Sequence, residues 1–438
     1  MSEWRRTLYT IWFTEFIAIL GFAFVGPFVP YYIQELGVVD SREVALWSGL
    51  ATSVTSLSLA VMAPVWGMLA DRHGRKIMVM RATFAGAVLM AMMGFVANVQ
   101  QLVLLRCLQG VFTGTIAAAT TLVASVTPKD KSGLALGSLQ TAIFLGTSLG
   151  PLLGGIMGDS LGYRPSFWIT GMLLFSSGVL VFLFIREDFH PVEDVARRRL
   201  AYGEALQFLL ASGGALAAVF AARIILRAGT QIMNPVLPLF VQSLLPTTAH
   251  VATMTGIISG AAAVGSAAGS PLVGRWGDKT SHRKLLIASG LAAALFYLPQ
   301  AFAPDSTWLV FWQLLTGFAI GGTLSTLTAL LIQYSPKGHE GVVIGLDSSA
   351  VGLANAIGPM AGAGIAAGVG LQAPFILSAG VMGVGALVVI LWMKERASSQ
   401  VAAPATMSSE SQKRPAHSAG QIEKSSPCQS PRSGGWGL

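Results

Sequence analysis

The sequence predicts an all-α membrane protein with twelve transmembrane helices in two pseudo-symmetric six-helix bundles. Three observations support this prediction: an apolar composition, a series of long apolar runs and an internal repeat. Hydrophobic residues make up 53% of the 438 residues and charged residues only 11%, whereas a soluble domain carries about 25% charged residues. So few charges cannot cover the surface of a soluble protein. The composition therefore excludes a soluble enzyme, a disordered protein and a disulfide scaffold.

Apolar runs of roughly 20 residues, the length that crosses a bilayer, recur along the chain as far as residue 393. The run that follows Met1–Arg6 resembles a signal peptide, but no small-residue cleavage site follows it, so we expect a retained first helix. The twelve predicted spans lie near residues 8–33, 43–70, 77–97, 100–126, 134–157, 165–186, 209–242, 251–276, 284–303, 306–333, 341–366 and 371–393.

The distribution of Lys and Arg predicts the orientation of these spans. With the N-terminus inside the cell, 23 of the 28 Lys and Arg residues, Arg81 among them, fall in cytoplasmic segments, only Arg42 and Arg164 fall in outer segments, and three lie within spans. Because cytoplasmic segments of membrane proteins are rich in Lys and Arg, we expect both termini in the cytoplasm. The net charge of +8 therefore reflects membrane topology, and we expect no nucleic-acid partner.

The chain repeats itself with an offset of about 208 residues. Pro27–Gln34 matches Pro235–Gln242, and Gly150-Pro151 matches Gly358-Pro359. An offset kept across several spans predicts two halves in parallel orientation. The predicted parts are a first bundle at residues 1–186, a cytoplasmic linker at 187–208, a second bundle at 209–395 and a disordered, Ser- and Pro-rich tail at 396–438.

The segment Gly67–Lys76 predicts an ordered turn between the second and third spans. Gly67 is expected to let a neighbouring helix approach closely, and Gly74 permits a backbone conformation that other residues resist. Asp71 is a carboxylate at a helix end, suited to a neighbouring helix N-terminus or to an arginine. The alternative is a solvated loop of positive charge.

The second half carries another copy of this turn. The copy keeps Gly274 and Asp278 but has Ser281 in place of the later glycine. We therefore expect a latch there that is weaker or differently shaped.

The fifth span carries glycines four residues apart, Gly146, Gly150 and Gly154, together with Pro151. Such glycines place a smooth face on a helix and allow close helix contact, and proline kinks a helix. The pattern indicates a rocker helix at the interface of the two halves. Ordinary helix packing is the alternative.

Ionisable side chains inside a span each cost roughly 2.5–3.5 kcal/mol on insertion scales, so they usually mark function. Glu15 and Arg223 occupy matching positions of the repeat. We hypothesise that Glu15 or Asp347 binds a transported proton and pairs with a buried arginine in another state. The alternatives are a permanent Glu15–Arg223 pair and a structural role for Asp347. The five such residues are Glu15, Arg106, Arg223, Arg227 and Asp347.

A polar stripe runs along the seventh span, and its members are Arg223, Arg227, Gln231 and Asn234. Their spacing of four, four and three residues places them on one helix face. A polar face in a bilayer must look onto water or protein, so we expect the first and seventh spans to line a central substrate cavity. Gln140 and Phe144 of the fifth span are further candidates for this cavity. Arg227 is an alternative contact for an anionic substrate.

Three of these segments resemble motifs of a known family. Gly67–Lys76 resembles motif A of the major facilitator superfamily, Leu102–Gly110 resembles its motif B, and Gly146–Gly155 resembles motif C of its exporters. The resemblance covers residues 1 to about 395. It is strongest to the bacterial drug:proton antiporters with twelve helices.

The resemblance implies roles for individual residues. Asp71, assisted by Arg72 and Arg75, would dock on the N-terminus of the eleventh helix and hold the halves closed on the cytoplasmic side. Arg106 would take part in proton coupling, and motif C would bend the fifth helix and pack it on the other half. The resemblance also implies a bacterial inner-membrane protein that exports amphiphilic toxic compounds in exchange for protons.

Several other functions find no support in the sequence. No Gly-Lys dipeptide occurs, so a Walker A phosphate loop is absent, and the six His residues lack metal-ligand spacing. We therefore expect no enzyme activity, no cofactor and no metal. The expected partners are a small-molecule substrate, protons and the lipid bilayer, and the expected state is a monomer. Alternatives are a dedicated sugar or organic-acid transporter, which the excess of buried cations would suit, and a non-transporting membrane sensor.

Overall fold

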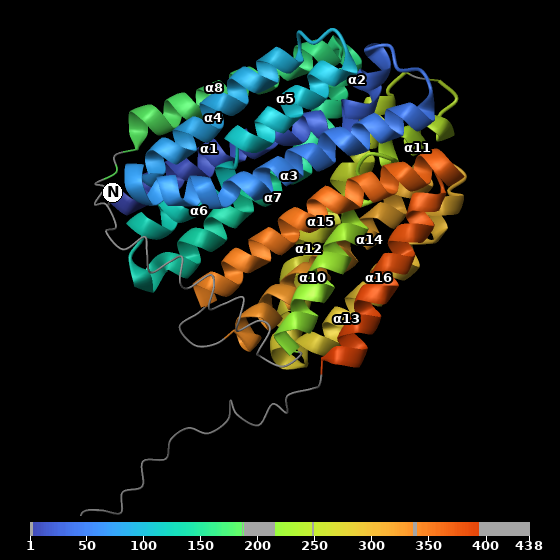
Figure 1. Cartoon of the computed structure of the whole chain (residues 1–438). Helices are drawn as coiled ribbons and strands as arrows, with labels where there is room; N and C mark the ends of the chain where they lie inside the picture. The colour runs from blue at the N-terminus through green and yellow to red at the C-terminus, as the bar shows by residue number, and fades with distance from the viewer. Residues whose placement is uncertain (1–2, 186, 188–214, 248, 336–339, 394–438) are drawn as a thin grey trace, which may run out of the picture. The chain divides into compact units, whose positions relative to one another are not determined.

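The computed structural model describes residues 3–185, 187, 215–247, 249–335 and 340–393 (Figure 1). The chain separates into a compact unit at residues 1–394 and a second unit at 395–438. The expected tail at 396–438 lies outside the described residues, and so does the expected linker at 187–208, apart from Glu187.

The described part of the first unit is built from helices and short connections. Three short 3-10 turns, Gly26–Phe28, Lys129–Lys131 and Pro299–Phe302, adjoin the main helices. In chain order the α-helices are α1 (Glu3–Val25), α2 (Val29–Glu35), α3 (Ser41–His73), α4 (Arg75–Met93), α5 (Val99–Phe112), α6 (Thr115–Val126), α7 (Ser132–Leu161), α8 (Tyr163–Phe184), α10 (Ala215–Gln231), α11 (Leu237–Leu244), α12 (Val251–Lys279), α13 (His282–Tyr297), α14 (Ser306–Tyr334), α15 (Glu340–Val369) and α16 (Ala373–Trp392).

Local sequence signals explain where several helices begin. The side chains of Asp40, Asn98 and Asp305 each accept a hydrogen bond from a backbone amide in the first turn of α3, α5 and α14. Such caps satisfy amide groups that have no partner inside the helix. Each of the three helices therefore begins at the residue directly after its capping side chain.

Eleven stretches of the described chain are long and apolar enough to cross a membrane. The seventh predicted span, 209–242, is described only from residue 215 and is divided into α10 and α11. The fourth predicted span, 100–126, is broken between α5 and α6, because Gly114 adopts a left-handed backbone with φ of 119°. The chain is thus a multi-pass membrane protein, and the broken fourth span is a feature that its apolar run did not reveal.

The two bundles are packed by the same rules. In the first, α1 packs on α7, α3 on α5 and α4 on α8; in the second, α10 packs on α15, α12 on α14 and α13 on α16. The structure therefore confirms two pseudo-symmetric six-helix bundles. Below, the first half means residues 3–185 and the second half means residues 215–393.

The halves meet through two helix pairs, α3 with α15 and α7 with α12. At Gly49 a side chain would meet Ala363, and at Gly256 it would meet the carbonyl of Pro151. Small residues at these points let the helix backbones approach closely, as is usual in membranes. In Figure 1, α3 and α15 lie side by side at the end away from the N-terminus and diverge toward the end that carries it.

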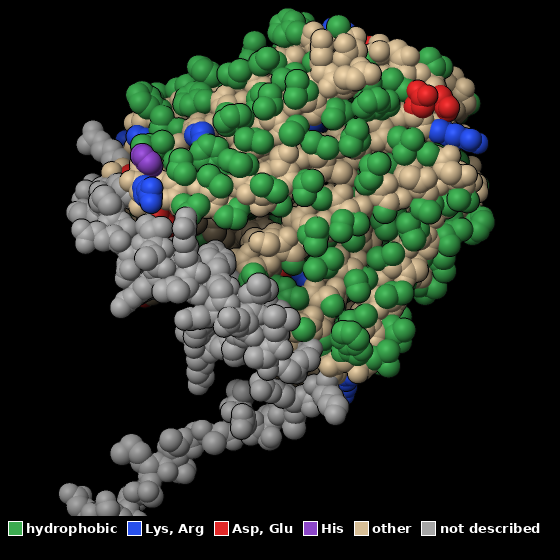
Figure 2. Space-filling view, viewed as in Figure 1, with side chains coloured by type: hydrophobic (Ala, Val, Ile, Leu, Met, Phe, Trp, Pro, Cys, Tyr) green, Lys and Arg blue, Asp and Glu red, His purple; other side chains and the backbone are tan. Residues whose placement is uncertain are grey.

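The outer surface suits a lipid environment. Large apolar side chains such as Leu57, Leu104, Met172 and Trp392 are exposed on the sides of the helices. In Figure 2 green apolar side chains cover this face, and most visible charged side chains gather at the helix ends. This distribution is what a bilayer demands of a helical protein.

Candidate functional site

The polar contacts between the halves lie at one end of the molecule. We call this end the opposite side, since the N-terminal side carries the start of α1 and the α3–α4 turn. The Tyr31 hydroxyl donates to the carbonyl of Pro238 at 2.7 Å and lies 2.7 Å from the hydroxyl of Thr255. Gln34 and Gln242, which match in the repeat, exchange hydrogen bonds between their side-chain amides at 2.9 and 3.2 Å.

Asp159 adds a charged contact to this closed end. Its two carboxylate oxygens accept hydrogen bonds from the backbone amides of Ala252, at 3.2 Å, and Thr253, at 2.7 Å. Asp159 ends α7 of the first half, and the two amides begin α12 of the second. A carboxylate at a helix N-terminus satisfies free amides and interacts favourably with the helix dipole. Asp159 therefore latches the halves together on the opposite side, a role that sequence reasoning missed.

The glycines of motif C are divided between two neighbouring helices. Side chains added at Gly146, Gly150 and Gly154 would meet α1 of the same half. Contact with α12 comes instead from the neighbouring positions Pro151 and Gly155. The fifth helix thus uses two faces: the glycines four apart lie against α1, and Pro151 and Gly155, also within motif C, lie against α12 of the other half.

The broken fourth span brings a hydroxyl to the buried Glu15. The Glu15 residue is 2% exposed, and the Thr115 hydroxyl, at the first residue of α6, donates to its Oε1 at 3.1 Å. Within the described chain, no Lys or Arg forms an ion pair with Glu15. The carboxylate is thus held by a neutral partner.

Arg223, the repeat mate of Glu15, has a different partner. Its Nε lies 2.8 Å from Oδ1 of Asp347, and its Nη2 donates to Oδ2 at 3.0 Å. The pair joins α10 to α15 within the second half. The alternative of a Glu15–Arg223 pair is therefore not found in this structure, in which the acid beside Arg223 is the partly buried Asp347.

Two other arginines of the spans, both partly buried, have neutral partners. Arg227 donates from Nε to the side-chain oxygen of Asn355 at 2.9 Å. Arg106 donates from Nη1 to Gln109 at 3.2 Å, while its Nε and Nη2 are buried without a hydrogen-bond partner. Such unsatisfied donors are costly in a structure at rest. They mark Arg106 as a group that can gain partners in another state.

The remaining candidates for the substrate cavity are only partly brought together. The Asn234 amide donates to Gln231 at 3.1 Å just beyond Arg227. On α7, Gln140 is exposed and Phe144 is partly buried. No described contact joins these two to the polar stripe of the seventh span.

The motif A turn is held by a residue outside the motif. Gly74 has a φ of 95° between α3 and α4, which only glycine adopts easily. The amides of Arg75 and Lys76 donate to the two carboxylate oxygens of Glu187 at 2.9 and 2.7 Å. Glu187 thus caps α4, and Arg72 is exposed at the end of α3.

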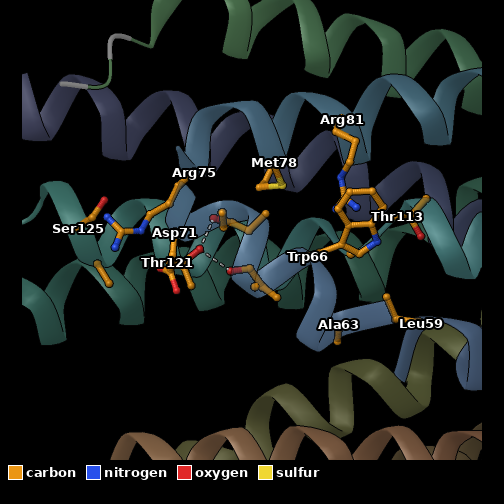
Figure 3. Close-up of a pocket in the computed structure, with 16 residues that line it drawn as sticks. Leu59, Ala63, Trp66, Asp71, Arg75, Met78, Arg81, Thr113, Thr121 and Ser125 are labelled. Atoms are coloured by element: carbon orange, nitrogen blue, oxygen red, sulfur yellow. Dashed lines mark hydrogen bonds between the residues drawn. The ribbon is translucent and has the colours of Figure 1, made fainter. Parts of the chain in front are cut away.

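Gly67 does not fulfil its expected role in this structure. Nothing lies within 4 Å of a side chain added there. Instead Gly67 lines a cavity together with Asp71 and Arg75 (Figure 3). No neighbouring helix fills this face of α3, because α15 has diverged from it.

The second copy of the turn has a different shape. Ser281 has an extended backbone, with φ of −143°, and its hydroxyl caps α13 by accepting from the amide of Lys284. A serine can replace the glycine because the connection between α12 and α13, Thr280–Ser281, has negative φ at both residues. Gly274 faces Ser325 of α14, and the side chain of Asp278 lies outside the described part of the chain.

Sequence comparisons identify relatives over most of the chain. The family model of the Major Facilitator Superfamily matches residues 11–245 and 219–427. The multidrug resistance protein MdtG of Dickeya zeae (strain Ech586) is 33% identical over 403 residues, which cover 92% of this chain and 98% of the relative. MdtG of Salmonella schwarzengrund (strain CVM19633) is 35% identical over 380 residues, covering 87% and 93% of the two chains.

Solved structures share the fold at low sequence identity. A bacterial homolog of the human lysosomal transporter Spinster, in an inward-facing and occupied conformation, gives a TM-score of 0.73 at 15% identity and covers 89% of this chain and 97% of its own. The nucleoside transporter NupG gives a TM-score of 0.73 at 14% identity and covers 89% and 100%.

Proposed function

The chain belongs to the major facilitator superfamily, and we propose that it is a secondary active transporter that exports amphiphilic drugs or toxic compounds in exchange for protons. Two features support the proposal. Its relatives at 33–35% identity are named multidrug resistance proteins, and its own bundles bury charges where a transported ion could act.

We propose that transport proceeds by alternating access, with this structure as the state closed on the opposite side. The register of α3 and α15 supports this. Gly49 meets Ala363, and Ala60 meets Gly352, so the contacts step by eleven residues in opposite directions along the two helices. One further step leads from Ala60 to Asp71 and from Gly352 to position 341, in the first turn of α15.

Closure on the N-terminal side would therefore bring Asp71 to the start of α15. A carboxylate placed there is favourable because helix N-termini carry free amides and a positive dipole end. Asp71 and Asp159 are then alternate latches, one for each side. Arg72 and Arg75 beside Asp71, and Asp278 in the second half, are proposed to complete the latch on the N-terminal side.

We propose that the N-terminal side faces the cytoplasm of a bacterial cell and that the protein works as a monomer in the inner membrane. The excess of Lys and Arg on this side supports the orientation. Export then begins with a cavity open to the cytoplasm.

Glu15 is the proposed proton carrier, and its lack of a cation partner is the observation that carries the coupling mechanism. Glu15 can take up a proton while losing only interactions with a neutral hydroxyl. Asp347 would first have to give up its ion pair with Arg223. Arg106, with two unsatisfied donors, is proposed to respond to the charge on Glu15.

A dedicated organic-acid transporter is the second candidate, and it is favoured by one observation. Arg106 and Arg227 are partly buried cations whose described hydrogen-bond partners are neutral amides. Both side chains could bind an anionic cargo without first breaking an ion pair. The proposed substrate cavity comprises Arg223, Arg227, Gln231, Asn234, Gln140 and Phe144.

Transport by purified protein in proteoliposomes tests these proposals. With an imposed pH gradient, we expect accumulation of amphiphilic compounds that collapses when a protonophore is added. Accumulation of organic acids or sugars alone would assign a dedicated transporter instead. If no compound moves and none triggers proton release, the transport function itself is wrong.

A further inference from the structure

A cavity of about 370 Å³ lies between α3, α4 and α6 on the N-terminal side. From α3 it is lined by Leu59, Ala63 and Trp66, on both sides of Ala60, the point at which α3 meets α15. The cavity thus begins where the two halves separate. It is a different place from the polar stripe of the seventh span.

Arg81 is the unusual group in this cavity. It lies six residues into α4, or about 9 Å along the helix axis. Its guanidinium carbon is 3.5 Å from the centre of the Trp66 ring, and Figure 3 shows Arg81 reaching from α4 onto Trp66 of α3. The charge pattern of the sequence places Arg81 among the cytoplasmic cations, but in the structure it lies inside the span, within α4.

The guanidinium of Arg81 is held against Trp66, but two of its hydrogen-bond donors have no partner. Its Nε and Nη1 are buried and have no hydrogen-bond partner, and no ion pair of Arg81 occurs in the part of the chain that the structure describes. Stacking on an indole fixes the cation through its flat face, which leaves its edge donors for another partner. Trp66 is itself fixed, because its ring nitrogen donates to the carbonyl of Val111 at 2.6 Å.

The rest of the wall is mostly apolar and made of small side chains. Five alanines and Met78 leave room for an apolar body, and the other charged groups at the cavity are Asp71 and Arg75. An arginine edge beside an apolar chamber matches a ligand with an oxyanion head and an apolar body. Arginine binds carboxylates and phosphates through paired donors.

We propose that this cavity, the Arg81 pocket, binds the acidic head of an amphiphile, supplied by a free compound or by an anionic lipid. The proposal rests on the transport function above and names a substrate class for it. Arg81 provides the charge-assisted hydrogen bonds, and Trp66 positions Arg81. Closure of α15 onto α3 would cover the pocket, since Gly67 and Asp71 on its wall lie on the α3 side that approaches α15.

The Arg81 pocket also adjoins the proposed proton site. Thr113 and Gly114 line the pocket, and the next residue, Thr115, donates its hydroxyl to Glu15. The break in the fourth span therefore has the pocket on one side and the carboxylate on the other. Gly114, which lines the pocket, directly precedes Thr115, the hydrogen-bond partner of Glu15.

Binding of a matched pair of probes tests the proposal. The probes are tritiated 4-(2-naphthyl)butyrate and its primary amide, which share an apolar body and differ in charge. Full-length protein in phosphatidylcholine nanodiscs is expected to prefer the acid. Arg81→Gln should weaken binding of the acid roughly 10- to 100-fold, as expected for lost hydrogen bonds from a charged donor, and change binding of the amide less than about threefold.

Two variants serve as controls. Arg164→Gln removes an arginine from an exposed ion pair with Glu35 and should leave both affinities unchanged. Arg81→Lys keeps the charge but loses the planar fork of donors, and we expect it to weaken the acid roughly threefold to tenfold. It also provides the test if Arg81→Gln does not give monodisperse protein.

Each outcome separates this proposal from the transport function. Equal binding of acid and amide by the unmodified protein, or an equal loss of both in Arg81→Gln, would overturn the Arg81 pocket even if pH-driven export of uncharged amphiphiles continues. An acid preference that depends on Arg81, without any pH-driven export, would keep the site and refute the transport function. Displacement of the acid probe in phosphatidylglycerol nanodiscs would identify a lipid head as the occupant, and undiminished binding would identify a free compound.

Discussion

The two halves share their helix packing but not their buried charges. Gly150 and Gly154 pack against α1, and their repeat mates Gly358 and Gly362 pack against the end of α10 and against Ile232, the residue after it. The interface follows the same symmetry, since α3 meets α15 as α12 meets α7. Both halves thus keep the smooth helix faces that a rocking motion needs.

The charges break this symmetry. In the second half, Arg223 and Asp347 neutralise each other across α10 and α15. In the first half, Glu15 is hydrogen-bonded to Thr115, and Arg106 to Gln109. The fourth span is broken at Gly114, whereas its counterpart α14 is continuous. The second half therefore holds a structural ion pair. The first half holds charged groups that can change partners without breaking an ion pair.

Breaking the Arg223–Asp347 ion pair should change stability more than any other substitution proposed below. Asp347→Asn leaves Arg223 as an uncompensated buried charge, which destabilises by about 3–5 kcal/mol, seen as a lower free energy of unfolding in detergent. The double variant Arg223→Gln with Asp347→Asn should recover most of the loss. Glu15→Gln, which has no ion pair to break, should change stability by less than about 1 kcal/mol. An Asp347→Asn variant as stable as the original protein would contradict a structural pair.

Matched glycine substitutions test the shared packing. Gly154→Ala places a methyl group against the carbonyl of Phe24, and Gly362→Ala places one against the carbonyl of Ile232. Overpacking of this kind costs about 1–3 kcal/mol, and we expect the two losses in thermal unfolding to be similar. A large loss in one half and none in the other would show that the packing is not equivalent.

A smaller change, in the rate of pH-driven transport, is expected when Thr115, the hydrogen-bond partner of Glu15, loses its hydroxyl. Thr115→Val removes a hydroxyl worth about 1 kcal/mol, which corresponds to roughly a fivefold slower pH-driven transport. Thr323→Val is the matched control, because Thr323 occupies the repeat position of Thr115 but donates to Ile320 of its own helix at 2.7 Å. Equal rates in the two variants would remove Thr115 from the proposed mechanism.

Much of the fold could be predicted from the sequence. Apolar runs of the right length and the repeat of Pro27–Gln34 at Pro235–Gln242 predicted two six-helix bundles, and matching positions paired Glu15 with Arg223. The repeat gives equivalence of position, however, and not contact. It could not reveal that Arg223 turns to Asp347, because that choice depends on how α10 packs on α15.

The site was harder to predict for the same reason. Gly114 ends a helix only because its backbone adopts a positive φ, and a glycine inside an apolar run gives no such signal. Arg81 followed a basic turn and was counted with it, although six residues of helix carry it onto Trp66. Asp159 stood alone at the end of a span, and its partners are backbone amides, which no side-chain pattern marks.

Glu15, and not the Arg223–Asp347 pair, is proposed to carry the transported proton. The direct test is substrate movement in proteoliposomes by Glu15→Gln, with the Arg223→Gln and Asp347→Asn double variant beside it. We predict that Glu15→Gln loses accumulation driven by a pH gradient but still exchanges labelled for unlabelled substrate, while the double variant keeps the driven accumulation. Driven accumulation at the original rate in Glu15→Gln would contradict the claim.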